Sequence, residues 1–119
     1  MATVNIANVT SITPFTINGA VTTSAVNIID VPADKLYKVN TILIANIDGS
    51  SAADISVSVS NDNGSGYYEI ASTISVPADS TLSLLSTTLY LDETDLLRVV
   101  ASANSDLTYT VSGEILDDA

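Results

Sequence analysis

The sequence predicts an all-β fold: an antiparallel β-sandwich of eight to nine strands, of the jelly-roll or Greek-key type. Apolar and polar residues alternate with a period of two in several segments, among them 55–60 and 107–112, and this pattern places the apolar side chains on one face of a strand. No window of the 119 residues has a sustained apolar stripe at helical spacing with caps. Abundant Ser, Thr, Val and Ile also favour strands over helices. At most a short turn of helix is expected.

Turn-forming residues divide the chain into its expected elements. The segment 41–45 is apolar on both faces, which predicts a central strand that is covered on both sides. The other segments read as half-buried strands on short loops. We expect strands at residues 2–9, 13–18, 21–30, 36–47, 53–60, 67–75, 81–90, 96–102 and 107–116.

Four connections have recognisable turn chemistry. The sequence Val-Pro-Ala-Asp occurs at 31–34 and again at 76–79. Proline before alanine predicts type I turns, because a type II turn would favour glycine at the alanine position. The dipeptides Asp48-Gly49 and Asn63-Gly64 predict hairpin tips in which residues tolerate positive φ.

The composition excludes most catalytic and cofactor chemistry. The chain has no His, Cys or Trp, and its basic residues are Lys35, Lys38 and Arg98. Zinc, haem and iron–sulfur sites need imidazole or sulfur ligands, and general bases near neutral pH are most often imidazoles. We therefore expect no enzyme and no cofactor. The net charge of −11 opposes binding to nucleic acid and to anionic membranes, and no segment approaches the ~18 apolar residues of a membrane span.

The first 29 residues contain no charged side chain. Two explanations stay open, and they are compatible: strands that use Thr, Asn and Ser on their exposed faces, or a contact with a partner, where charged groups are depleted. We expect residues 1–20 to form a strand-like arm and residues 21–119 to form the sandwich. The candidate docking residues of the arm are its large apolar side chains, Val4, Ile6, Val9, Ile12, Phe15 and Ile17.

Two polar clusters contain oxygen ligands of the kind that bind calcium or another divalent ion. The segment 61–66 resembles a calcium loop in composition, but its glycine comes too early and no acid follows at the twelfth place. A solvated hairpin tip fits it better. The acidic turn of Asp92, Glu93 and Asp95 could hold a divalent ion at a symmetric contact, although solvation is the default for such a cluster. No metal site is assigned.

The adjacent aromatic pair Tyr67-Tyr68 raises a different alternative. On a strand the two rings point to opposite faces, which predicts one ring in the core and one at the rim. With the polar loop 61–66, the pair could also read cell-surface glycans.

Nearly the whole chain resembles a known kind of protein. The segments 4–10, 38–49, 74–79 and 89–98 are similar to the small β-rich virion structural proteins of tailed bacteriophages, especially those of marine cyanobacteria. The chain departs from them at Thr94, where glycine is expected after the acidic pair. Because threonine disfavours positive φ, this turn is expected to differ.

The resemblance implies a β-sandwich that coats the outer surface of a capsid as a decoration (cement) protein. The implied partners are the major capsid protein and other copies of this chain, and we expect trimers. The alternative is a tail- or baseplate-associated module for host glycan recognition. No catalytic residue follows from the resemblance.

Overall fold

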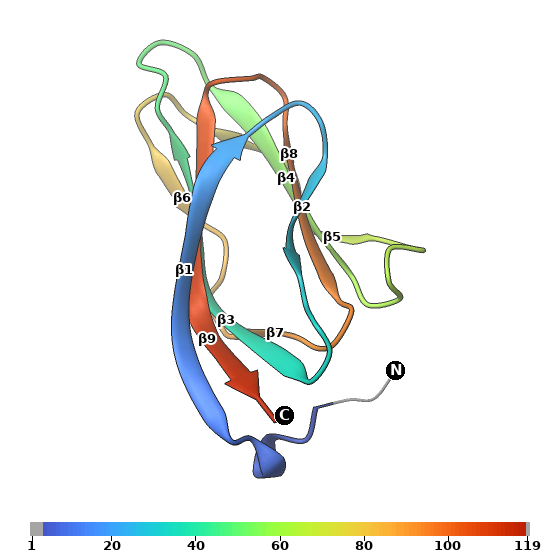
Figure 1. Cartoon of the computed structure of the whole chain (residues 1–119). Helices are drawn as coiled ribbons and strands as arrows, with labels where there is room; N and C mark the ends of the chain where they lie inside the picture. Colours follow the sequence, from blue (N-terminus) through green and yellow to red (C-terminus); the bar gives the residue numbers. More distant parts are fainter. Residues whose placement is uncertain (1–3, 119) are drawn as a thin grey trace.

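The computed structural model describes residues 4–118. Two antiparallel sheets face each other across a single main core (Figure 1). The first sheet has the strand order β1-β9-β3-β6, with β7 also paired to β3, and the second has the order β2-β8-β4-β5. The predicted all-β antiparallel sandwich is confirmed.

The described residues form nine strands and one short 3-10 turn. Their bounds are η1 Ile6–Asn8, β1 Ser11–Val21, β2 Val26–Asp30, β3 Lys35–Asn46, β4 Ala53–Ser60, β5 Tyr68–Val76, β6 Thr81–Ser83, β7 Leu89–Leu91, β8 Leu96–Ala101 and β9 Leu107–Asp117.

The strand pairing is nested. β1 pairs with β9, β2 with β8, β3 with β6 and β7, and β4 with β5. The chain therefore folds back on itself as one long hairpin that is rolled into two facing sheets. This is the topology of a jelly roll, with β6 and β7 together occupying the place of one strand.

β9 is an interior strand of the first sheet and lies between β1 and β3. Figure 1 shows β1 (blue) and β9 (red) side by side along their length. Their register is continuous from Ser11↔Asp117 to Val21↔Leu107 without a bulge. The pairing of β3 with β9 instead shifts between Val39 and Thr41.

The main core is built from the inward-facing residues of both sheets. Strand alternation places one side chain in two on the inner face, which explains the period of two in the sequence. Phe15 and Tyr37 pack against this core, with ring centroids 5.2 Å apart. The largest fully buried side chains are Ile42, Ile44, Ile55, Leu91, Leu97, Leu107, Val21, Val31, Val39, Val57, Val76 and Val99.

A buried amide connects the end of β3 to its surroundings. Asn46 is 3% exposed, and its Nδ2 donates to the carbonyl oxygens of Ser51 and Val76 at 2.9 Å each. Its Oδ1 accepts from the backbone N–H of Asp48. A buried polar group is stable when its hydrogen bonds are made, so Asn46 fixes the loop that follows β3.

Three expected strands differ from the structure. The strand predicted at 21–30 begins only at Val26, because Val21 ends β1 and residues 22–25 connect β1 to β2. The strand predicted at 2–9 is wrong for its described part: residues 6–8 form η1, because the Asn5 side chain accepts from the backbone N–H of Ala7 and caps the turn. Residues 2 and 3 lie outside the described range. The strand predicted at 81–90 is two short strands, β6 and β7, separated by residues 84–88.

The proline turns begin one residue later than predicted. In the second of them the N–H of Ser80 donates to the carbonyl of Pro77, so the proline is the first turn residue. Asp34 and Asp79 adopt φ of 65° and 57° in the equivalent third position. Aspartate tolerates this left-handed conformation better than most residues. The hairpin tip at Asn63 and Gly64 has the predicted positive φ at both residues.

Candidate interaction surfaces

Part of the outer face of the first sheet, which spans four strands, has no charged side chain. Its side chains alternate with core residues and align in three rows across the register. All are uncharged, and all except Leu43 are small or polar. We call this surface the uncharged face; its residues are Thr16, Asn18 and Ala20 of β1, Thr108, Thr110 and Ser112 of β9, Thr41, Leu43 and Ala45 of β3, and Thr81 and Ser83 of β6.

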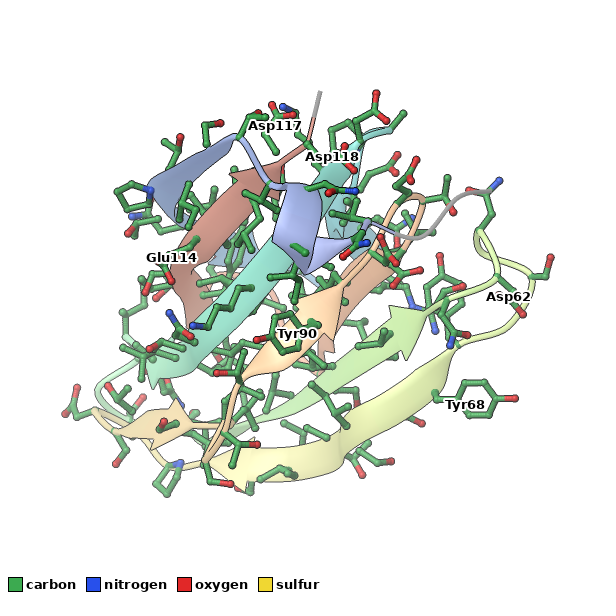
Figure 2. All side chains as sticks on the ribbon, turned by 90° about the horizontal axis from the view of Figure 1, so that it is seen from below. Asp62, Tyr68, Tyr90, Glu114, Asp117 and Asp118 are labelled. Atoms are coloured by element: carbon green, nitrogen blue, oxygen red, sulfur yellow. The ribbon has the colours of Figure 1, made fainter. Side chains whose placement is uncertain are left out.

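The acidic residues gather instead at one end of the sandwich, which Figure 2 views from below with Asp62, Asp117 and Asp118 labelled. The β2–β3 and β7–β8 loops lie at this end together with the end of β9, and the β4–β5 loop projects to one side of it. All fourteen acidic residues are described. The eight that lie at this end are Asp30, Asp34, Asp62, Asp92, Glu93, Asp95, Asp117 and Asp118. We call it the acidic end.

Both lysines are already paired with carboxylates of β9. Lys35 forms an ion pair with Asp117, which raises the pKa of the lysine, and Lys38 lies 3.7 Å from Glu114. The Lys38–Glu114 pair lies next to the Thr41–Ser112 row, at the border of the uncharged face that is nearer the acidic end. Of the carboxylates at the acidic end, Asp117 is thus paired with a lysine, and the end as a whole stays strongly negative.

The acidic turn between β7 and β8 is a structural cap. Asp92 Oδ1 accepts from the backbone N–H groups of Glu93 and Val4, at 2.8 and 3.1 Å, and the N–H of Asp92 donates to Asp95 Oδ2. Thr94 adopts φ of 65°. The turn thus takes the left-handed conformation despite threonine.

Asp95 is the buried carboxyl of this turn. It is 7% exposed, and its Oδ1 has no hydrogen-bond partner. Burial raises the pKa of Asp95 above its ordinary value, and the nearby Asp92 charge adds to the increase. Within residues 4–118, no three His, Cys, Asp or Glu side chains are arranged to hold a metal ion.

At the opposite end of the sandwich, Asp48 and Asp106 interact with each other. The backbone and side chain of Ser50 donate to Asp48, and these hydrogen bonds hold the pKa of Asp48 below its ordinary value. Partial burial and the Asp48 carboxylate raise the pKa of Asp106. Each of the two carboxyl groups thus affects the pKa of the other. Neither is a nucleophile or a base suited to neutral pH.

The N-terminal segment 4–10 packs on the outer side of the first sheet near the acidic end. Val4 is 6% exposed and forms a small second cluster with Leu36 and Leu116, against which Val9 packs. The N–H of Thr10 donates to the carbonyl of Asp117 at 2.8 Å. The described part of the segment is thus seated on its own sheet.

The six predicted docking residues fall into different environments. Val4 and Val9 belong to the second cluster, whereas Ile6 and Ile12 are 57% and 59% exposed. Phe15 and Ile17 lie in β1 and pack against the main core. The structure therefore places residues 11–20 within the sandwich, and docking by the segment stays a proposal.

The loop 61–66 is a tight hairpin tip. Asp62 Oδ1 accepts from Ser60 Oγ at 2.8 Å and from the N–H of Gly66 at 2.9 Å. These hydrogen bonds lower the pKa of Asp62. The side chain of Asp62 therefore serves the turn itself, as predicted for a hairpin tip.

The two tyrosines that follow the loop differ from the prediction, because neither lies in the core. Tyr67 packs on the outside of the second sheet, with the Arg98 guanidinium 3.6 Å from its ring centroid and its hydroxyl donating to Asn27 Oδ1. Arg98 Nε also donates to Ser58 Oγ. Tyr68 is 73% exposed and points into solvent (Figure 2).

Sequence reasoning missed the uncharged face as a surface. The absence of charge in residues 1–29 is visible in the sequence, but β3, β6 and β9 complete the face from segments that lie far from β1 in the chain. The sequence feature that could have indicated this face is the Thr and Ser residues on the polar side of segment 107–112. Similarly, nothing in the sequence indicated that Arg98 would stack on Tyr67.

The chain matches no family model and no curated protein. It is similar to several solved structures. One is a subunit of Bacillus endospore appendages, described as disulfide-linked pili (TM-score 0.55, 13% identity, covering 90% of this chain and 86% of that one). Another is a pentameric capsid protein from metagenomic phage sequences (TM-score 0.50, 18% identity, 87% and 62% covered). A third is from infectious bursal disease virus (TM-score 0.51, 8% identity, 93% and 34% covered).

These likenesses show a shared fold. The chain spans less than two thirds of the length of the two viral proteins. The named structures are a subunit of a bacterial appendage, a phage capsid protein and a chain of a virus. The present chain has no cysteine, so it cannot form disulfide links of its own. No helix among residues 4–118 has the length and apolar character needed to cross a membrane.

Proposed function

We propose that the chain is a non-enzymatic structural protein of a virus particle, a decoration (cement) protein that binds the outside of a phage head. The observation that most supports this is the uncharged face of a chain whose net charge is −11. Charged residues are depleted at the centre of protein interfaces. The uncharged face is therefore the surface that we assign to the shell, with the major capsid protein as its partner.

The N-terminal segment extends this docking surface. Ile12 is exposed at the lower end of β1, opposite Leu116, and Ile6 is exposed on η1. Exposed apolar side chains gain free energy when a partner removes them from water, about 1.5–3 kcal/mol for a fully buried isoleucine. The part of the acidic end that lies away from this segment then faces solvent, where its charge keeps particles apart and opposes contact with DNA.

Such a protein acts by linkage. A ligand that binds only the assembled shell stabilises that shell by its binding free energy at every occupied site. Surface area and a rigid scaffold are sufficient for this, and the jelly roll supplies both. The fold shared with viral capsid proteins supports the same role.

The test uses purified capsids of the virus that encodes the chain. Wild-type protein is expected to bind the capsids and to raise the temperature at which they open. Thr110→Lys combined with Leu43→Lys is expected to lower occupancy, because it puts two charges in the contact. Ser75→Lys, on the exposed β5 of the second sheet, is the matched control and should bind as wild type. Failure of the wild type to bind refutes the role.

One observation favours the second candidate, a tail- or baseplate-associated module for host glycans. Tyr68 is 73% exposed beside the polar loop 61–66, and a free aromatic ring can stack on a sugar. The Tyr67 ring, in contrast, is occupied by Arg98. A glycan array separates the candidates: binding that is lost in Tyr68→Ala favours recognition, whereas cement protein binds shells and ignores sugars.

A further inference from the structure

The four free edges of the two sheets are not equally protected. Proteins guard exposed strand edges with short strands, bulges or charged side chains, because an unprotected edge pairs with other chains. β6 and β7 have three residues each. β2 has five residues, a bulge and a terminal Asp30, and β5 has two register shifts, Glu69 and a positive φ at Thr73.

β1 is neither short, bulged nor charged, and its only protection is one proline. It is an edge strand of eleven residues, its register with β9 is unbroken, and it contains no charged side chain. Seven of its residues, including Thr16, Asn18 and Ala20, are exposed. A long, regular, uncharged edge of this kind is a template for strand addition.

Pro14 indicates which backbone groups face outward. Proline has no N–H, so within a paired strand it is placed where its nitrogen points away from the neighbouring strand. Backbone groups alternate in direction along a strand. The N–H and C=O groups of Thr16, Asn18 and Ala20 therefore point to the free edge in the same direction as Pro14.

We propose that the free edge of β1 pairs with β1 of a second copy of this chain, antiparallel and about a two-fold axis centred on Asn18. An antiparallel edge is complementary to itself, because each free N–H meets a C=O of the same sequence. The pairing extends over residues 15–21 and stops where Pro14 offers no donor. Asn18 then lies opposite Asn18, and Thr16 lies opposite Ala20.

Charge favours this partner and this orientation. Two copies with a net charge of −11 each repel one another, and β1 is a strand along which they can meet without opposed carboxylates. The antiparallel arrangement also directs the two acidic ends to opposite ends of the pair, which lowers their mutual repulsion.

The pairing also enlarges the docking surface. With strands about 4.8 Å apart and about 3.4 Å per residue, the uncharged face covers roughly 400 Å² including side chains. A stable protein interface buries about 800 Å² on each partner. A two-fold axis perpendicular to the sheet puts both uncharged faces on the same side and doubles the area. The pairing itself does not depend on the virion role, and it replaces the trimer expected from the sequence by a dimer.

The test measures the molar mass of the protein by sedimentation and light scattering, at protein concentrations up to about 1 mM. At about that concentration, a dimer with a binding free energy of about 4 kcal/mol is half formed. Wild-type chain should form dimers. Asn18→Lys and Asn18→Asp should each weaken dimerisation about fivefold, because like charges then oppose each other, and an equimolar mixture of the two variants should restore it. Asn18→Pro, which removes a free-edge N–H, should remain monomeric with an unchanged thermal transition. Thr110→Lys, in the same row on the interior strand β9, should dimerise as wild type.

Four results overturn the proposal. The first is a wild-type chain that stays monomeric at about 1 mM. The second is an oligomer that Asn18→Pro leaves intact. The third is a ring with an odd number of copies, which a two-fold contact cannot build. The fourth is a mixture of the Lys and Asp variants that associates no better than either alone. Capsid binding is measured separately, so loss of the dimer and loss of the virion role are distinguishable.

Discussion

Gly113 of β9 lies directly against the backbone of Lys38 in β3. A Cβ atom at position 113 would be 1.9 Å from the carbonyl oxygen of Lys38 and 3.0 Å from the Cα of Val39. The close approach occurs where the β3–β9 register shifts between Val39 and Thr41. Glycine is therefore required here by space, because a bulge brings two backbones together.

Gly113→Ala is expected to destabilise the fold by about 3 kcal/mol or more, since the obstructing atoms belong to the backbone and cannot rotate away. Urea denaturation measures the change. Gly49→Ala is the matched control: its Cβ would meet only the Asp79 carboxylate at 3.7 Å, which is ordinary contact. An alanine at 113 that costs no more than the one at 49 would contradict the bulge geometry.

The pH dependence of stability is expected to reveal the buried Asp95. Because the pKa of Asp95 is raised in the folded state, its neutral form favours folding, and that contribution is lost as the pH rises from the ordinary value of 3.8 through the folded pKa. The stability of Asp95→Asn relative to wild type should therefore increase with pH over this range, as measured by thermal melts.

Asp62→Asn supplies the control with the opposite sign. The pKa of Asp62 is lowered by its hydrogen bonds, so its charged form favours folding, and the contribution is lost as the pH falls through the folded pKa. This variant should be less stable than wild type at neutral pH and should approach it in acid. Parallel pH profiles for the two variants would show that the assigned environments are wrong.

The seat of the N-terminal segment predicts a contrast between two neighbouring residues. Val4→Ala should cost about 1.5 kcal/mol, because two methyl groups leave the cluster with Leu36 and Leu116. Ile6→Ala should stay within about 0.5 kcal/mol, since Ile6 is 57% exposed. Denaturant midpoints measure both. Equal effects would mean that the segment is not seated on the sheet in solution.

The stacking of Arg98 on Tyr67 should be measurable as a coupling energy. A double-mutant cycle of Arg98→Ala and Tyr67→Leu is expected to give about 0.5–1 kcal/mol, the usual value for a partly exposed cation–π pair. Tyr68→Leu is the control and should show no coupling to Arg98. Additive single effects at 67 and 98 would rule out the stacked arrangement in solution.

The sequence was most informative where a strand has one buried and one polar face. The predicted strands 53–60 and 107–116 agree with β4 and β9 to within a residue, because alternation marks such strands directly. It failed at residues 6–8, where the local cap by Asn5 outweighed the apolar pattern. It also failed at 81–90, where Leu84 and Leu85 pack against the core from irregular backbone.

The uncharged face could be anticipated only in part. Periodicity tells which side of β1 is polar, but it does not tell that Asn18 lies beside Thr110 or that Leu43 comes next. That information depends on register between segments far apart in the chain. The same holds for Gly113, whose role follows from the position of Lys38 across the sheet.

A reconstruction of the virion tests the central claim most directly. We expect jelly-roll density on the outer surface of the head, with the uncharged face toward the shell, β1 edges paired between copies and the acidic end in solvent. Density for this chain in the tail, or on the head with the uncharged face fully exposed to solvent, would contradict the account.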